Sequence, residues 1–177
     1  MPHIMKKSVI IIISLLALSF AWQACNKVYS DYTPYIKYSD FYVNPIRNSH
    51  DSIIGAKDTL MATWKDSRYL LDTISVNDTV YFGVAFGSYS NNLLGALITF
   101  DSTQLAFTLE LDKSIKEALL PESDVKNGQL KFQSGYNLVT FPVWYRPLKP
   151  GTFDLQFTVE SDSKSSPVTY FFRQPVK

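Results

Sequence analysis

The side chains that usually carry out catalysis are scarce in this sequence. His50 is the one histidine outside the N-terminal segment, and it stands in a loop-like NSHDS stretch. A Ser-His-Asp relay would have to use this imidazole, but no Gly-x-Ser-x-Gly nucleophile motif occurs and no His-x-x-x-His metal pair can form. We therefore expect a non-enzymatic protein with no catalytic residue, no metal site and no cofactor.

Paired carboxylates offer the remaining route to an enzyme. A glycosidase needs only two acids about 5 to 10 Å apart, so a small glycoside-active enzyme is the less favoured alternative. The strand and turn positions of the glutamates favour solvated surface charges instead. These residues are Glu110, Glu117, Glu122 and Glu160.

The one cysteine, Cys25, predicts covalent chemistry of another kind. It directly follows an apolar run, Ser8 to Ala24, which Lys6 and Lys7 precede. The charged start and the short apolar run are typical of an export signal, and a lone cysteine in an oxidising envelope calls for an explanation other than a disulfide. We predict a lipoprotein signal peptide over residues 1–25, with Cys25 lipidated. The alternatives are a plain secretory signal and an N-terminal anchor helix with a buried free cysteine.

Exposed aromatic residues are the best candidates for a ligand site. A sugar ring can stack its C–H face on a flat indole or phenol. Trp64 stands in the polar MATWKDSRY stretch, and Trp144 alternates with the apolar residues of its strand. The alternative for both tryptophans is that they fill the core. The stacking candidates are Trp64, Tyr89, Tyr136 and Trp144.

A short pattern, Asp followed by Ser or Thr and then a small or apolar residue or Thr, recurs five times. It resembles the acceptor motif for protein O-glycosylation in Bacteroidota, and composition alone would give about one occurrence. The alternative is local backbone chemistry, because Asp and Thr favour turns that begin strands. The candidate acceptors are Ser52, Thr59, Thr73, Thr79 and Ser102.

Composition after position 25 indicates one globular domain. The 177-residue chain keeps 152 residues there, and 15 of its 17 basic residues stand against 16 acidic ones once Lys6 and Lys7 are removed. No basic stripe is present, so we expect no nucleic-acid partner. We expect a tether and first strand over residues 26–54, and a β-sandwich domain over residues 55–177. A tyrosine recurs every third position in this tether; the four are Tyr29, Tyr32, Tyr35 and Tyr38. They could meet a partner, or the stretch from Tyr35 to Val43 could pack or form β pairs against the domain, which we favour.

Apolar residues alternate with polar or small ones along most of the domain. Thr79 to Phe86, Asn137 to Tyr145 and Thr152 to Glu160 each place one apolar face against the core. Pro142 indicates an edge strand or a bulge, and Asn127-Gly128 indicates a hairpin turn. Seven or eight such strands predict an all-β, antiparallel, immunoglobulin-like β-sandwich. One short helical turn is expected over residues 112–120, with Asp112 as its N-cap and Pro121 at its end.

The chain resembles small surface lipoproteins of Bacteroidota. The resemblance is carried by the Lys-Lys signal, Cys25, the polar tether and one sandwich with the ending GQLKFQSGYNLVTFPVWYRPLKPGTFDLQFTVES. Within the domain, an alternating strand, an LLPESD-like turn, a strand with a glycine turn and a Phe-Asp-Leu-Gln-Phe strand follow one another. This order is similar to that of immunoglobulin-like domains in lipoproteins that accompany starch-utilisation-type glycan uptake systems. The resemblance implies a lipid-anchored, non-catalytic protein of the bacterial outer membrane, on its periplasmic face or at the cell surface. It implies binding to a carbohydrate or to an outer-membrane partner protein, with a structural or assembly subunit as the alternative.

Overall fold

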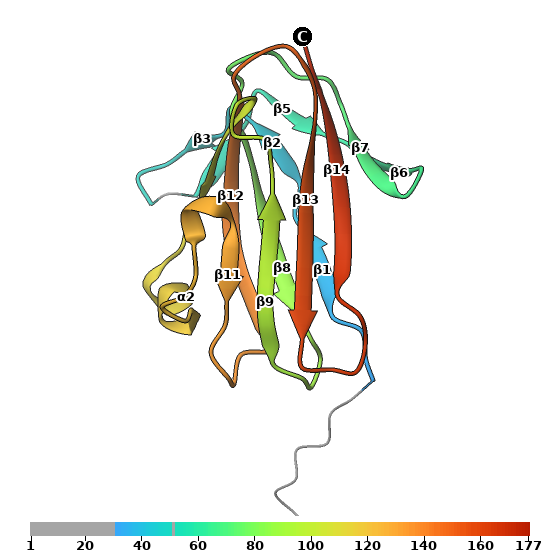
Figure 1. Cartoon of the computed structure of the whole chain (residues 1–177). Coiled ribbons are helices and arrows are strands. Elements are labelled where there is room, and N and C mark those ends of the chain that lie inside the picture. Colours follow the sequence, from blue (N-terminus) through green and yellow to red (C-terminus); the bar gives the residue numbers. More distant parts are fainter. Residues whose placement is uncertain (1–30, 51) are drawn as a thin grey trace, which may run out of the picture.

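Two β-sheets packed face to face form the described part of the chain (Figure 1). The computed structural model describes residues 31–50 and 52–177, so the predicted signal peptide and Cys25 lie outside the described residues. Within that range one hairpin and one short α-helix accompany the two layers. The structure confirms the all-β, immunoglobulin-like sandwich with one short helical element.

Sheet 1 has the order β10-β12-β8-β2-β5, and β1 also pairs with β8. Its strands are β1 (Tyr35–Tyr38), β2 (Phe41–Val43), β5 (Asp58–Leu60), β8 (Val80–Gly87), β10 (Leu105–Leu109) and β12 (Leu138–Pro147). Sheet 2 has the order β11-β9-β13-β14-β7-β6, in which β14 and β7 run parallel. Its strands are β6 (Ala62–Lys65), β7 (Arg68–Leu71), β9 (Leu93–Thr99), β11 (Gln129–Lys131), β13 (Gly151–Ser161) and β14 (Val168–Val176).

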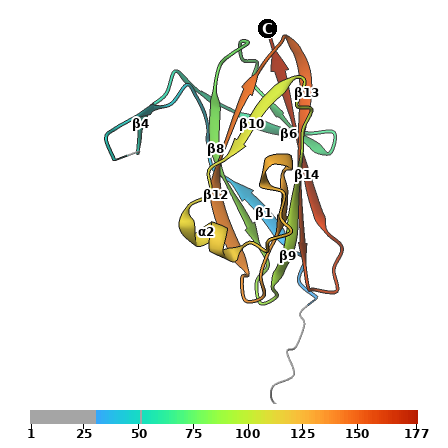
Figure 2. The same ribbon diagram turned by 60° about the vertical axis from the view of Figure 1, so that its left-hand side comes forward.

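Two smaller units lie outside the sheets. Strands β3 (Ile46–Arg47) and β4 (Ile53–Gly55) form a hairpin that projects away from the sandwich (Figure 2). Between β10 and β11 the chain forms α2 (Lys113–Ala118) and a 3-10 turn, η1 (Val125–Asn127). The predicted N-cap is confirmed, because the Asp112 carboxylate accepts a hydrogen bond from the Ile115 N–H at 2.9 Å.

The period of two places the core between the sheets, as predicted. Every second residue of β8, from Val80 to Phe86, is almost completely buried, and so is every second residue of β13, from Phe153 to Val159. Full burial of one such apolar side chain contributes about 1.5–3 kcal/mol relative to exposure. The two inward faces therefore hold the layers together.

One extra residue between β1 and β2 changes which side chains of β2 face the core. Ser39 pairs with Gly83 through two hydrogen bonds of 2.9 and 2.7 Å, whereas Tyr42 pairs with Tyr81. Three steps along the chain therefore match two steps along β8, which is a β-bulge. Without the extra residue, the alternation would point Asp40 inward; with it, Phe41 is buried instead.

Two local expectations are wrong. Pro142 lies in β12, which is an interior strand of regular register. Its missing N–H is tolerated because its carbonyl meets the Glu110 N–H one residue beyond the end of β10, where the ladder stops. Asn127-Gly128 does not join hairpin strands but ends η1. Gly128 has a φ of +73°, and a Cβ there would collide with the Ile98 carbonyl oxygen.

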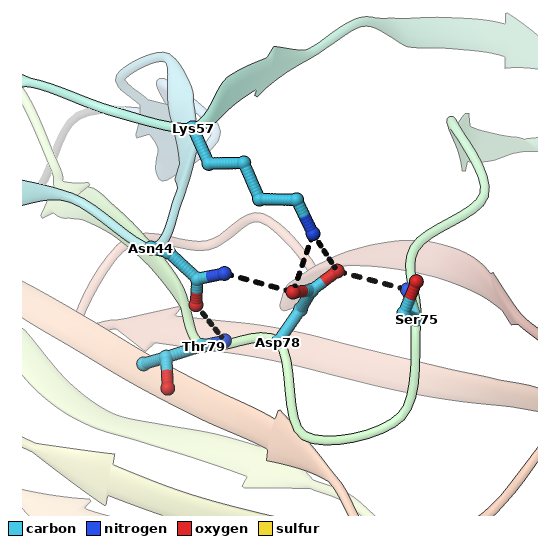
Figure 3. A network of polar contacts seen from close by, with 5 residues as sticks. All are labelled: Asn44, Lys57, Ser75, Asp78 and Thr79. Carbon is cyan, nitrogen blue, oxygen red and sulfur yellow. Dashed lines mark hydrogen bonds and ion pairs between the residues drawn. The ribbon is translucent and has the colours of Figure 1, made fainter.

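A buried carboxylate fixes the start of β8 to the end of β2 (Figure 3). Asp78 accepts hydrogen bonds from Lys57 Nζ at 2.8 and 3.1 Å, from Asn44 Nδ2 at 2.8 Å and from the Ser75 N–H at 3.0 Å. Asn44 in turn accepts from the Thr79 N–H at 2.8 Å. Burial alone would raise the pKa of Asp78, but these donors outweigh it and hold the pKa below its usual range.

We predict that Asp78→Asn destabilises the fold at neutral pH by about 1–3 kcal/mol, because the charge-assisted bonds to Lys57 are lost. A folded-state pKa below the unfolded value stabilises the protein above about pH 4, and this contribution is lost as the pH falls further. Urea unfolding at pH 7 and at pH 3 should therefore show a smaller difference between wild type and variant at pH 3. Asp66→Asn, in an exposed turn, is the matched control and should change stability by less than about 0.5 kcal/mol at either pH.

Candidate functional site

The four predicted stacking residues lie on separate surfaces. Trp64 lies on the β6–β7 hairpin, and Trp144 lies on the outer face of sheet 1. Tyr89 and Tyr136 lie in loops at the end of the sandwich where the N-terminal segment enters, and neither tryptophan is in the buried core. The structure therefore offers three aromatic surfaces and does not join them into one site.

Trp64 is the exposed tryptophan, with 55% of its surface accessible. Its ring centroid lies 4.7 Å from that of Tyr69 at 64° and 6.3 Å from that of Tyr170 at 61°. A two-residue turn, Asp66-Ser67, with φ values of 51° and 60°, joins the strands and places Trp64 directly opposite Tyr69. Positive φ at both positions is the geometry of the tight turns that suit twisted hairpins. The indole is thus braced from below and still open to a ligand.

The brace under Trp64 continues into the core. Tyr69 stacks on Phe172 with centroids 5.1 Å apart at 18°, and Tyr38 meets both rings edge-on at 5.0 and 5.2 Å. Burial, followed by the hydrogen bond with Tyr69, raises the pKa of Tyr38 well above its usual range. The packed rings of Tyr38, Tyr69 and Phe172 therefore fix the orientation of Trp64.

Trp144 is covered by an arginine that the sequence analysis did not identify. The guanidinium carbon of Arg47, in β3, lies 4.5 Å from the centroid of Trp144 and 4.9 Å from that of Tyr81. Arg47 also reaches Glu110 at 3.4 Å. Cation–π contacts of this kind contribute about 0.5–2 kcal/mol. A sugar could stack on this side of Trp144 only if the hairpin moved, and no spacing in the sequence relates Arg47 to Trp144.

The two loop tyrosines differ in what they can present. Tyr89 is 63% exposed, and its ring contacts Tyr32 and Tyr35 with centroids 5.4 and 5.2 Å apart. Tyr136 is half-buried and lines a small cavity of about 240 Å³ beside α2. Tyr89 is therefore accessible to a flat partner, whereas Tyr136 mainly packs. Tyr29 of the predicted tyrosine stripe lies outside the described residues.

The candidate glycosylation sites show both features that the sequence left open. Some of their aspartates make local bonds typical of turns: Asp58 accepts from the Thr59 N–H, and Asp101 accepts from the Thr103 N–H and hydroxyl. Four of the five acceptor residues are nevertheless exposed, and Thr79 is half-buried. Their modification stays a prediction, and the exposed acceptors are Ser52, Thr59, Thr73 and Ser102.

The described ranges also contain candidate acid, base and metal-ligating side chains. Glu110 pairs with Arg47, and Glu117 pairs with Lys113 at 3.8 Å on the surface of α2. His50 is exposed in the β3–β4 hairpin. Among residues 31–50 and 52–177, no group of three or more His, Cys, Asp or Glu side chains could hold a metal ion. No helix in these ranges has the length and apolar character to cross a bilayer.

Comparison with known proteins gives distant structural likenesses. No protein-family model matches the chain, and no curated protein is similar to it in sequence. Among solved structures, a family 123 glycoside hydrolase from Clostridium perfringens matches 61% of the chain at 12% identity and a TM-score of 0.37. The secreted serine protease VesC from Vibrio cholerae matches 59% of the chain at 8% identity and a TM-score of 0.36. The matches cover 23% and 21% of those two proteins. A PapD-like domain of human CEP192 matches 64% of the chain, and 82% of its own length, at 7% identity and a TM-score of 0.34. At these values the likenesses carry no inference about activity or ligand.

We predict that acrylamide distinguishes the two tryptophans of the domain. Trp64, measured alone in Trp144→Phe, should be quenched more strongly than Trp144, measured alone in Trp64→Phe, because Arg47 covers the latter. Arg47→Ala should raise the quenching of Trp144 and leave that of Trp64 unchanged, since Arg47 contacts Trp144 directly. The measurement uses residues 26–177, which lack Trp22. Equal quenching of the two indoles would contradict the cover.

Proposed function

We propose that this chain is a lipid-anchored, non-catalytic protein of the bacterial outer membrane that binds a carbohydrate through the Trp64 surface. The protein would be an accessory lipoprotein, similar to those of starch-utilisation-type glycan uptake systems. The anchored domain lies on the periplasmic face of that membrane or at the cell surface. The exposed, braced indole of Trp64 is the observation that carries it.

The Trp64 surface has the features that sugar stacking needs. The indole is rigid, because two tyrosines hold it and Phe172 holds one of them. A rigid aromatic ring loses little conformational entropy on binding, so more of the stacking energy becomes affinity.

A second candidate function is a structural or assembly subunit that binds a partner protein. The β3–β4 hairpin favours it, because the hairpin projects from the sandwich (Figure 2) and exposes Ile46 and Ile54. Exposed apolar residues on a projecting element are typical of protein contacts. This candidate predicts a fixed protein partner and no dependence on Trp64.

For carbohydrate binding we predict that Trp64→Ala weakens affinity about tenfold or more, equivalent to about 1.4 kcal/mol or more, because a central aromatic contact is removed. A glycan array identifies the ligand, and calorimetry with that ligand measures the loss. Trp144→Phe is the matched control, and it should bind as the wild type does because Arg47 covers Trp144. An empty array and unretarded migration in polysaccharide affinity gels would reject the carbohydrate ligand. A protein partner that binds the wild type and depends on the β3–β4 hairpin would then support the second candidate.

For the anchor we predict that a radioactive fatty acid fed to growing cells labels the wild-type protein and does not label Cys25→Ser. Cys25 is the sole cysteine, so no other thiol can take the lipid. When the same strains are fractionated, the variant should be found outside the membrane fraction. Equal labelling of the two proteins would overturn the lipidation of Cys25.

A further inference from the structure

We propose that one end of the sandwich, the tyrosine end, contacts the headgroup layer of the membrane and orients the domain. We define the tyrosine end by Tyr32, Tyr35 and Tyr89 together with the exposed Leu138 at the start of β12. It is the end at which the N-terminal segment enters, opposite the end that carries the C-terminus (Figure 1). This inference rests on the proposed anchor at Cys25 and goes beyond it, because an anchor alone fixes no orientation.

The tyrosine end is accessible and aromatic. Tyr32 is 65% exposed, Tyr89 is 63% exposed, and their ring centroids lie 5.4 Å apart. Tyrosine combines an apolar ring with a polar hydroxyl, and such side chains gather where hydrocarbon meets water. The rings of this cluster therefore match the chemistry of a headgroup layer.

The tyrosine end is also rigid. The Tyr35 ring lies directly over the backbone of Gly87, where an added Cβ would overlap it. Tyr35 then supports Tyr89, whose carbonyl accepts a hydrogen bond from Asn137 Nδ2 at 2.8 Å. The Ser88 N–H donates to the Asn137 carbonyl, also at 2.8 Å. The aromatic cluster is thus prearranged and needs little ordering when it meets a surface.

The chain before the domain is too short to hold this end far from a bilayer. Asp31 is attached to the β13–β14 loop, where its carboxylate lies 3.7 Å from Lys164 Nζ and its carbonyl accepts from the Ser165 hydroxyl. Five residues separate Cys25 from Asp31 in the sequence. Even a fully extended segment of that length spans at most roughly 20 Å, since each residue adds about 3.3–3.6 Å. A lipidated Cys25 therefore keeps Tyr32 close to the headgroups.

Charge at the tyrosine end does not oppose this contact. Asp31 is paired with Lys164, and Lys37 lies 5.2 Å from the centroid of Tyr35. The Asp31 carboxylate is thus compensated, and the Lys37 ammonium favours a surface that carries phosphate groups. A bilayer is the occupant that the anchor itself supplies, whereas a soluble partner would have to enter the narrow space beneath the domain.

Fluorescence quenching by lipid tests the proposal. Tyr89→Trp in a Trp64→Phe, Trp144→Phe background gives one indole at the tyrosine end. The acylated protein is reconstituted in phosphatidylcholine vesicles that contain a headgroup nitroxide lipid. We expect Trp at position 89 to lose most of its fluorescence, while proteins that keep only Trp64 or only Trp144 lose little. Little quenching at position 89, or equal quenching at all three positions, overturns the proposal.

A second arm separates failure of this inference from failure of the anchor. Residues 25–177, coupled through Cys25 to a maleimide lipid, place the same chain on the same vesicles without cellular acylation. Quenching at position 89 in this arm supports the docking geometry even if mass spectrometry finds the native Cys25 bare. If position 89 escapes the nitroxide but is shielded from acrylamide, a second copy covers the tyrosine end and the proposal is wrong. Gly87→Ala should reduce the quenching, because it displaces Tyr35 from beneath Tyr89.

Discussion

Packing around Phe82 connects the two sheets, and the other features of the domain depend on it. This ring is fully buried in β8 of sheet 1. Its centroid lies 4.4 Å from that of Phe41 in its own sheet and 5.9 Å from that of Phe157 in sheet 2. Phe41 reaches this position only because the bulge at Asp40 reverses the facing of its strand. Inserting or deleting one residue in that strand would therefore disturb the core before it disturbed any surface.

The same packing extends to the proposed binding surface. Phe172 contacts Phe41 and Phe157 on one side and stacks on Tyr69 on the other, and Tyr69 braces Trp64. Aromatic contacts thus run without interruption from the core to an exposed indole. A surface built in this way has a fixed shape because the core beneath it has one. This is a physical reason to place recognition at Trp64 and not on a loop.

Periodicity was enough to predict the long strands, because one face of each is buried and the other is wet. The short strand β5 was not predicted, since three residues show no period. For residues 35–43 the sequence indicated packing or β pairing, but a bulge breaks their alternation, so the facing of β2 could not be predicted. The prediction of an edge strand or a bulge at Pro142 was wrong, because an interior strand tolerates a proline where its neighbouring strand ends. No local sequence pattern shows where that neighbour ends. The cover of Trp144 by Arg47 and the contact of Tyr32 with Tyr89 join distant parts of the chain. Residue type could suggest Trp64 and Tyr89 as candidates, but exposure and neighbours came only from the fold.

The place of β14 in sheet 2 has a consequence for how the domain assembles. This strand, residues 168–176, lies between β13 and β7, and its parallel pairing with β7 joins residues far apart in the sequence. Closing so long a loop costs entropy before any contact repays it, so this pairing belongs to the slow steps of folding. Until it forms, β14 has an open edge and the β6–β7 hairpin has no sheet to join. The hairpin that carries Trp64 is thus among the last elements to acquire its final surroundings, and a partly folded chain would lack the binding surface while exposing an adhesive strand edge.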